Sequence, residues 1–295
     1  KGPIDLNGHN LALIANAAGG CEGRLYVEGG ISGSGDVFAY ANTRILQDTF
    51  NAWGVVEFRE MGNDFSGRLF LDSMRDGAEI LLNVSSGVVV NDRLIVDGLG
   101  TVKFGRPNQI GDAATVRIQD GAMLHMEGHD DTILNLELAN DEYDISPSVL
   151  DTGGGTLTVE GNVTSTSDIS GQTPAIKGKL HLPGGPHTFD ISRTVYAGLD
   201  LQAQISGGGG FSKLGDAALL LRGDNTFEGS VNVAGDTIDV YHANGFGSTR
   251  RGVTLSGGSV ALHDLYVHGE TLFVRGDGQI TAHTRGSLLA CLGEG

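Results

Sequence analysis

Three residues between positions 125 and 129 have side chains that could bind a metal ion. His125, Glu127 and His129 alternate along the chain, so on a β-strand all three would lie on one face. Imidazole and carboxylate groups are ligands for zinc and related metals. In a second interpretation this face is the solvated outside of the protein, with Leu124 and Met126 pointing inward. Because an i, i+2 pattern is short, we expect the second interpretation and no metal. The polar residues of a related region later in the chain do not keep the spacing: His263, Asp264, His268 and Glu270.

Two Arg-Gly-Asp triplets are candidates for integrin-type cell adhesion. They are Arg222-Gly223-Asp224 and Arg275-Gly276-Asp277. Motifs of three residues carry a high false-positive risk, and Gly-Asp is also a common turn pair. Both triplets fall where corners of the chain are expected. A structural role is therefore favoured, and adhesion through the triplets stays as the lesser hypothesis.

Acidic residues are the remaining candidates for chemistry. Asp141, Glu142 and Asp144 form an acidic turn, but no EF-hand spacing accompanies them, which favours a charged loop over a calcium site. Polysaccharide lyases and glycosidases would need carboxylates paired on neighbouring turns of the chain. The acids here are scattered, Trp53 is the only tryptophan, and no GxSxG or SxxK motif provides a serine nucleophile. A carbohydrate-active enzyme is therefore the alternative function, and no catalytic residue is assigned.

Composition limits the classes of protein that can carry these residues. The chain has 295 residues, of which 48 are glycine and 6 are proline, and its formal net charge is −17. Many glycines with few prolines suit a fold with many turns and backbone-paired strands. The negative charge predicts no nucleic-acid partner, and no apolar run is long enough to predict membrane insertion of this chain. The first residues also lack the pattern of a signal peptide.

Short segments recur in the same order in the two halves of the chain. The matched pairs are IDLNGHNLAL at 4–13 with LDTGGGTLTV at 150–159, ISGSG at 31–35 with ISGGG at 205–209, NDFSG at 63–67 with NTFEG at 225–229, NQIG at 108–111 with NGFG at 244–247, and TVRIQDGAM at 115–123 with GVTLSGGSV at 252–260. Matches that keep their order across gaps of variable length indicate duplication. We therefore predict two degenerate copies of one unit, about 1–145 and 146–295, within a single domain.

Between the glycine-rich marks lie short segments with the composition of β-strands. Eight of them are rich in Val, Ile, Leu and Thr, at residues 25–27, 55–58, 94–96, 101–104, 156–159, 219–221, 231–233 and 253–255. No 12-residue stretch has a capped helical period. Strands this short, with insertions of any length at the corners, favour a right-handed parallel β-helix over a propeller or a sandwich. In that fold glycine and asparagine serve the corners, because they accept positive φ.

Residues 205–248 follow a longer pattern. It consists of Gly-Gly-hydrophobic-x-Lys-x-Gly, a strand, Gly-x-Asn-x-aromatic-x-Gly, a second strand and an Asn-x-x-Gly corner. The matching positions are Gly209, Gly210, Phe211, Lys213, Gly215, Leu219, Leu221, Gly223, Asn225, Phe227, Gly229, Val231, Val233, Asn244 and Gly247. This stretch resembles the autotransporter-associated β-strand repeat, whereas the first half of the chain matches only loosely. The resemblance implies a right-handed parallel β-helix in a bacterial surface-displayed or secreted passenger region.

These observations lead to one expected function. We expect a non-catalytic structural and adhesive segment, at the bacterial cell surface or extracellular, that presents loops and needs no cofactor. Its expected partners are a host surface or a polysaccharide, and further copies of itself through the ends of the helix, where open backbone groups would need a cap. Cys21 and Cys291 lie near opposite ends of such a helix, too far apart for an internal disulfide. A disulfide between two chains and two buried thiols are the alternatives, and buried thiols are favoured because Cys291 lies in the apolar run 288–292.

Overall fold

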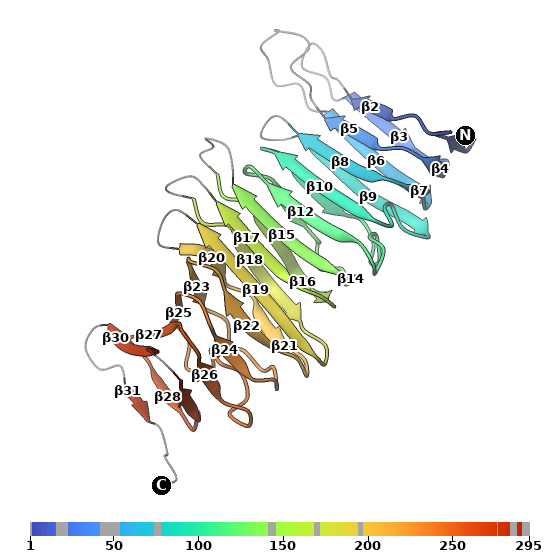
Figure 1. Ribbon diagram of the computed structural model, residues 1–295. Coiled ribbons are helices and arrows are strands. Elements are labelled where there is room, and N and C mark those ends of the chain that lie inside the picture. Colours follow the sequence, from blue (N-terminus) through green and yellow to red (C-terminus); the bar gives the residue numbers. More distant parts are fainter. Residues whose placement is uncertain are drawn as a thin grey trace.

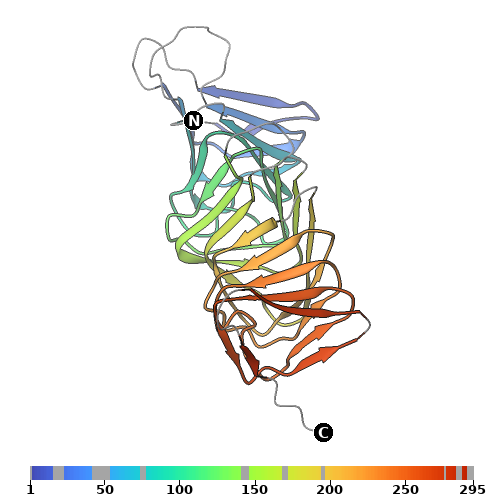
Figure 2. The same cartoon turned by 90° about the vertical axis from the view of Figure 1, so that its left-hand side faces the viewer.

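The protein is a stack of parallel β-strands. Its computed structural model describes residues 2–15, 23–41, 54–73, 78–140, 146–167, 172–193, 197–275, 277–283 and 288–290. Within these residues all strand pairs are parallel and no helix is present, so none could span a membrane. Successive turns of the chain, here called coils, stack into an elongated body with its two ends far apart (Figures 1 and 2). The parallel β-helix predicted from the sequence is confirmed. Cys21, Trp53, Cys291 and the acidic turn at 141–144 lie outside the described residues.

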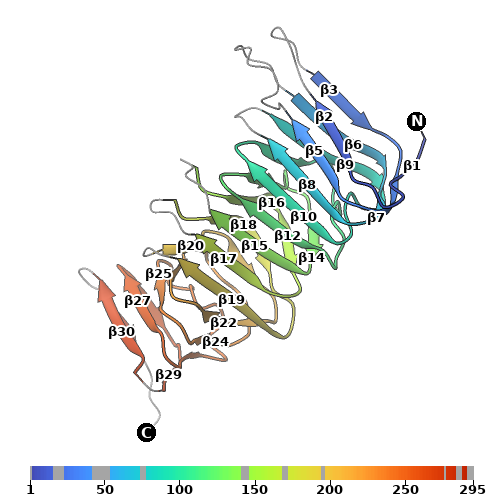
Figure 3. The same ribbon diagram turned by 45° about the horizontal axis from the view of Figure 1, so that its top comes forward.

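Each coil contributes one strand to each of two long sheets, and the strands of sheet 1 lie side by side in Figure 3. Sheet 1 contains, in order, β2 (Leu11–Ala15), β5 (Val37–Ala41), β8 (Arg68–Ser73), β10 (Arg93–Gly98), β12 (Thr115–Gln119), β15 (Asn135–Asn140), β17 (Val163–Ser167), β19 (Pro186–Arg193), β22 (Gly210–Leu214), β24 (Val231–Val233), β26 (Val253–Leu255) and β29 (Leu272–Val274). Sheet 2 contains β3 (Gly23–Val27), β6 (Gly54–Met61), β9 (Glu79–Ser86), β11 (Thr101–Phe104), β13 (Met123–His125), β16 (Val149–Val159), β18 (Ala175–His181), β20 (Ala197–Leu201), β23 (Ala218–Leu221), β25 (Thr237–Val240), β27 (Ser259–His263) and β30 (Gln279–His283).

A third side connects each strand of sheet 2 to the next strand of sheet 1. Its strands are shorter and less continuous: β1 (Ile4–Asp5), β4 (Ile31–Ser34), β7 (Asp64–Ser66), β14 (Asp131–Ile133), β21 (Gln204–Ser206), β28 (Tyr266–His268) and β31 (Leu288–Ala290). β14 and β21 pair with the second halves of β16 and β18, which continue from sheet 2 onto this side. All eight segments that the sequence predicts as strands lie within strands of sheets 1 and 2.

The core runs the length of the stack as columns of aliphatic side chains. One inward column of sheet 2 consists of residues in direct register on successive coils: Val56, Ile80, Val102, Leu124, Leu150, Ile176, Leu201, Leu221, Val240 and Leu262. Each of them is at most 2% exposed. Burying one such side chain contributes about 1.5–3 kcal/mol, so each coil is stabilised mainly by the coils above and below it.

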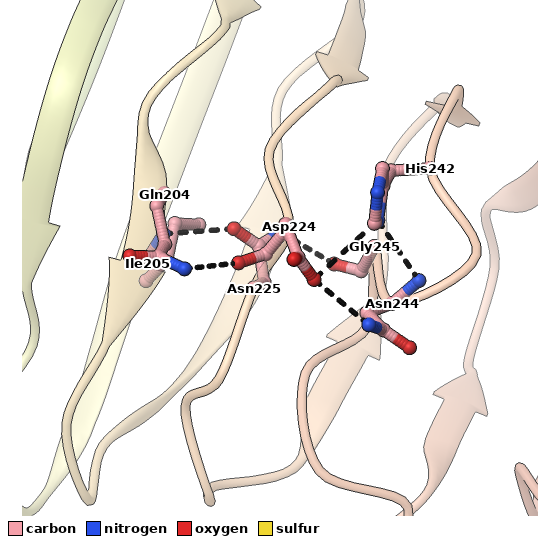
Figure 4. A network of polar contacts seen from close by, with 7 residues as sticks. All are labelled: Gln204, Ile205, Asp224, Asn225, His242, Asn244 and Gly245. Carbon is pink, nitrogen blue, oxygen red and sulfur yellow. Dashed lines mark hydrogen bonds and ion pairs between the residues drawn. The ribbon is translucent and has the colours of Figure 1, made fainter.

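Two buried asparagines on the third side join each of their coils to both neighbours. The Asn63 side chain accepts a hydrogen bond from the Ile31 N–H at 3.0 Å and donates one to the Val89 carbonyl at 2.8 Å. Asn225 makes the corresponding two bonds at 2.8 and 2.7 Å (Figure 4). Because a buried amide without partners is costly, these paired bonds explain why asparagine occupies both positions.

The recurring segments of the sequence mostly mark equivalent places in different coils. Phe65 and Phe227, from the NDFSG and NTFEG segments, are both buried beside their bridging asparagines. The alignment of residues 4–13 with 150–159 is wrong, however. Ile4 lies in β1 on the third side, whereas Leu150 lies in sheet 2. A gapless match of apolar and glycine positions does not distinguish one side of a coil from another.

Both sheets continue through the proposed boundary between the two copies. β13 pairs with β16 and β15 pairs with β17, on either side of residues 145 and 146. The described residues therefore form one stack, and the origin of that stack in two copies stays a prediction.

Candidate functional site

The three residues considered as metal ligands do not share a strand. β13 ends at His125, and Glu127 has a φ of 52°, so the chain turns there. The Glu127 N–H donates to His125 Nδ1 at 3.1 Å, and His125 Nε2 lies 3.8 Å from Asp151 Oδ2. Leu124 and Met126 point inward as expected, with 2% and 0% exposure. The described part of the chain contains no group of three or more His, Cys, Asp or Glu residues that could hold a metal ion.

The first Arg-Gly-Asp triplet is built into a corner of the stack. Arg222 Nε donates to Asp200 Oδ1 at 2.6 Å, and a Cβ added at Gly223 would collide with a backbone carbonyl of the preceding coil. Asp224 accepts a hydrogen bond from Asn244 Nδ2 at 2.8 Å and lies 3.7 Å from His242 Nδ1 (Figure 4). Its side chain nevertheless stays 59% exposed. The corner position predicted for this triplet thus coexists with an accessible carboxylate.

The second triplet lies near the C-terminal end of the stack. Arg275 and Asp277 are both exposed, and the Arg275 N–H donates to the Leu255 carbonyl at 2.8 Å. Gly276 lies outside the described residues. The described side chains of this triplet are therefore accessible at one end of the molecule.

The stack also brings together a column of polar and aromatic side chains on the outside of sheet 2. Arg222, Tyr241 and His263 follow one another on successive coils: the guanidinium lies 4.1 Å from the Tyr241 ring centre, and the Tyr241 and His263 rings stack at 4.3 Å. His263 Nε2 lies 2.8 Å from Asp239 Oδ1, and the Asp239 side chain is fully buried. Burial, together with the Asp239 carboxylate, raises the pKa of Tyr241. A buried carboxylate that orients a partly exposed imidazole is an arrangement suited to proton transfer.

The two carboxylates that contact this column, Asp200 and Asp239, are separated by two steps of the sheet. Asp200 is in register with Leu220, and Leu220 with Asp239, so their backbones lie about 9–10 Å apart. Asp200 is bonded to Arg222 and to Gln202, and Asp239 to His263. Each of the two carboxylates therefore accepts a hydrogen bond from a nearby polar side chain.

A different arrangement occurs on the outside of sheet 1, toward the N-terminal end. Register places Phe38 beside Phe70, Tyr40 beside Asp72, and Asp72 beside Asp97. Burial, reinforced by the neighbouring Asp97 carboxylate, raises the pKa of Asp72 to about 6. Asp72 and Asp97 are thus a pair of carboxylates on neighbouring coils, which their positions in the sequence alone do not reveal. We call these five residues the aromatic–carboxylate surface.

The sequence contains a signal of the aromatic–carboxylate surface. The strands VFAYA, LFLDS and LIVDG have the same alternation, and writing them in register places the two aspartates next to each other. The chain between β5 and β8 has 26 residues and that between β8 and β10 has 19, and these unequal lengths hide the alignment until the coils are known.

Two other buried ionisable groups lie in the C-terminal half. Lys213 occupies an inward position of sheet 1 between Phe189 and Val233, and its Nζ donates to the carbonyls of Gly215 and Gly235 at 3.2 and 2.8 Å. Burial lowers the pKa of Lys213 to about 8. Glu270 is 4% exposed, and burial raises its pKa to about 7. Through its bond to the Gly235 carbonyl, Lys213, the lysine of the sequence pattern, links its own coil to the next one.

The aromatic positions of that pattern, Phe211 and Phe227, are used for packing. The Phe211 ring lies between those of Phe189 and Phe227, with centre-to-centre distances of 4.6 and 5.6 Å.

No family model matches the chain, and comparisons with curated proteins and with solved structures found no match. The fold defines the class of protein as a parallel β-solenoid.

Proposed function

We propose that the chain is a non-catalytic structural and adhesive segment of a bacterial surface-displayed or secreted protein of the autotransporter type. The observation that carries this proposal is the use of polar side chains to bind coil to coil. Asn63 and Asn225 each bond to the coils on both sides, and Lys213 to two backbone carbonyls. Such a stack holds its shape without a cofactor and presents corners along its whole length.

Cell attachment to the immobilised chain tests the adhesive part of this proposal. The variant Asp224→Glu with Asp277→Glu lengthens both exposed acids of the triplets while keeping their charge. If the triplets bind a receptor, attachment falls to the level of an uncoated surface. Asp190→Glu, an exposed acid elsewhere on the stack, is the matched control. Attachment that is equal for all three proteins would rule out adhesion through the triplets.

We also propose that copies of the chain associate end to end. Of the large hydrophobic side chains that are exposed among the described residues, most belong to the first coil or to the last two: Ile4, Ile14, Tyr26, Tyr266, Phe273, Val274 and Ile280. Stacking of a second copy would cover these groups and pair open strand edges.

Light scattering over a range of concentrations tests this association. We expect the mass to rise with concentration, and Val274→Lys to abolish the rise, since Val274 is 51% exposed at the C-terminal end. Leu214→Lys changes a residue that is 37% exposed in the middle of the stack and should have no effect. A constant monomer mass at every concentration would contradict end-to-end association.

A second candidate function is a carbohydrate-active enzyme, a polysaccharide lyase or glycosidase. The specific observation in its favour is the outer column of sheet 2, in which Asp239 holds His263 beside Tyr241 and Arg222. The guanidinium suits an acidic polysaccharide, and the imidazole suits proton transfer. Release of new reducing ends from acidic polysaccharides, lost in His263→Gln, would replace the non-catalytic proposal with this one.

A further inference from the structure

The aromatic–carboxylate surface is a half-buried patch on the outside of the stack, in which the Phe38 and Phe70 rings are tilted by 48° to each other. Phe38 and Tyr40 lie on β5 with parallel rings, 6.3 Å apart at an angle of 6°, and Phe70 of the next coil lies 5.8 Å from Phe38. These three rings point away from the core, because the residues between them, Ala39 and Leu71, are fully buried. β5, β8 and β10, which carry the surface, lie next to one another in Figure 3.

The charges of this surface are unbalanced at Asp72. The parallel register places Asp97 directly beside it, so that two carboxylates lie about 4.8 Å apart along the stack at the backbone. The arginines of the same face are paired with other acids: Arg68 of β8 contacts Asp36 at 2.7 Å, and Arg93 of β10 and Arg117 of β12 contact Glu137 at 2.7 and 3.7 Å. Asp97 accepts hydrogen bonds from the Gly98 N–H and from Gln119. A positive charge brought to Asp72 from outside would therefore relieve repulsion within the surface.

The combination of rings and carboxylates selects a particular kind of ligand. Aromatic faces attract a cation that has little hydration and also cover the apolar face of a ring-shaped ligand. Carboxylates beside the rings bind an ammonium group by charge-assisted hydrogen bonds. Because the surface extends over three coils at a spacing close to the length of a pyranose ring, it fits an extended chain of sugar units better than a single small cation.

We propose that the aromatic–carboxylate surface binds a glycan with free amino groups, with sugar rings on Phe38 and Phe70 and an ammonium group between Tyr40 and Asp72. This goes beyond the display function, since it assigns a ligand to a face that the triplets and the ends of the stack do not include. It also holds whether or not the triplets mediate attachment.

Titration calorimetry with a glucosamine hexamer tests the proposal, at a pH just above the pKa of Asp72 so that the carboxylate is ionised. The fully N-acetylated hexamer has the same rings without the charge. We expect the free-amine hexamer to bind and the acetylated one to bind about tenfold more weakly or not at all, a difference of about 1.4 kcal/mol. Equal binding of the two hexamers, or no binding of the free-amine hexamer, would overturn the proposal.

Variants show whether the binding occurs at this surface. Asp72→Asn keeps the shape of the side chain and should weaken binding of the free-amine hexamer about tenfold. Asp190→Asn changes an exposed acid of β19 on the same sheet and should leave it unchanged. Phe70→Leu tests the ring separately, and thermal unfolding verifies that each variant is folded. Loss of binding in Asp190→Asn as well as in Asp72→Asn would point to net charge alone and contradict the site.

A lysine-rich peptide of equal charge separates the two sources of ammonium groups. A glycan site should bind it more weakly than the hexamer, because the peptide has no ring faces to lay on Phe38 and Phe70. Binding of the peptide as tight as that of the hexamer would overturn the assignment to a glycan. Cell attachment through the triplets is measured independently, so failure of either proposal leaves the other to be judged by its own result.

Discussion

Two groups of carboxylates on the outside of the same stack have opposite surroundings. On sheet 2, Asp200 is bonded to Arg222 and Asp239 to His263, each from a neighbouring coil. On sheet 1, the coil next to Asp72 offers a second aspartate. The stacking geometry is the same in both places, since parallel register always sets like positions side by side. The residues that successive coils place side by side therefore decide whether a carboxylate has a partner within the stack or can bind a ligand from outside.

The largest effect on stability is expected on the outside of sheet 2, where a carboxylate loses its partner. His263→Ala removes a donor from a fully buried carboxylate, and we expect the free energy of unfolding to fall by about 2 kcal/mol. Urea denaturation measures this change. His9→Ala removes an exposed histidine and should have little effect. If both variants lost the same stability, the Asp239–His263 contact would contribute nothing, and the contrast between the two faces would disappear.

On the outside of sheet 1, removing the charge of Asp72 is expected to raise the stability instead of lowering it. The pKa of Asp72 is raised from 3.8 to about 6, so between these values the folded chain holds a proton that the unfolded chain has released. Proton binding therefore stabilises the folded chain at low pH, and this stabilisation is lost as the pH rises from 3.8 to about 6. Asp72→Asn avoids the loss and should be more stable by about 1 kcal/mol at neutral pH, after allowance for solvent screening. Thermal unfolding across the pH range measures the difference, which should vanish at acidic pH. A destabilised Asp72→Asn at neutral pH would contradict the assignment of repulsion.

The smallest effect concerns an exposed side chain on the outside of sheet 2. The Arg222 side chain is 38% exposed, and Arg222→Gln should cost about 0.5 kcal/mol through loss of the Asp200 ion pair and the contact with Tyr241. Because salt screens the ion pair, the difference in melting temperature from the wild type should shrink in concentrated salt. A loss that is independent of salt would assign the effect to packing on Tyr241 instead.

The repeating architecture was predictable from the sequence because its signals are local. Short runs of Val, Ile and Leu between glycines mark strands such as β11 and β24, whose bounds agree with the predicted segments. The corner asparagines were visible as matching NDFSG and NTFEG segments. These features depend on neighbouring residues and on the few conformations that turns allow.

The candidate sites were less predictable because they depend on contacts between coils. Asp72 and Asp97 are neighbours only after the chain has returned by one full coil, and coils of unequal length conceal the register. The histidine pattern failed for a different reason. A positive φ at Glu127 ends the alternation within two residues of His125. Because glutamate is not a residue type that indicates positive φ, the sequence gives no sign of this turn at that position.

The bridging asparagines have a mechanical consequence. If the chain is pulled from its termini, a stack of this kind opens from its ends, one coil at a time. When the opening reaches Asn63 or Asn225, the departing coil must also release the side-chain bonds that clamp it to its neighbour. The resistance to pulling should therefore be uneven along the molecule, with the clamped coils acting as stops that limit how far a partial rupture spreads.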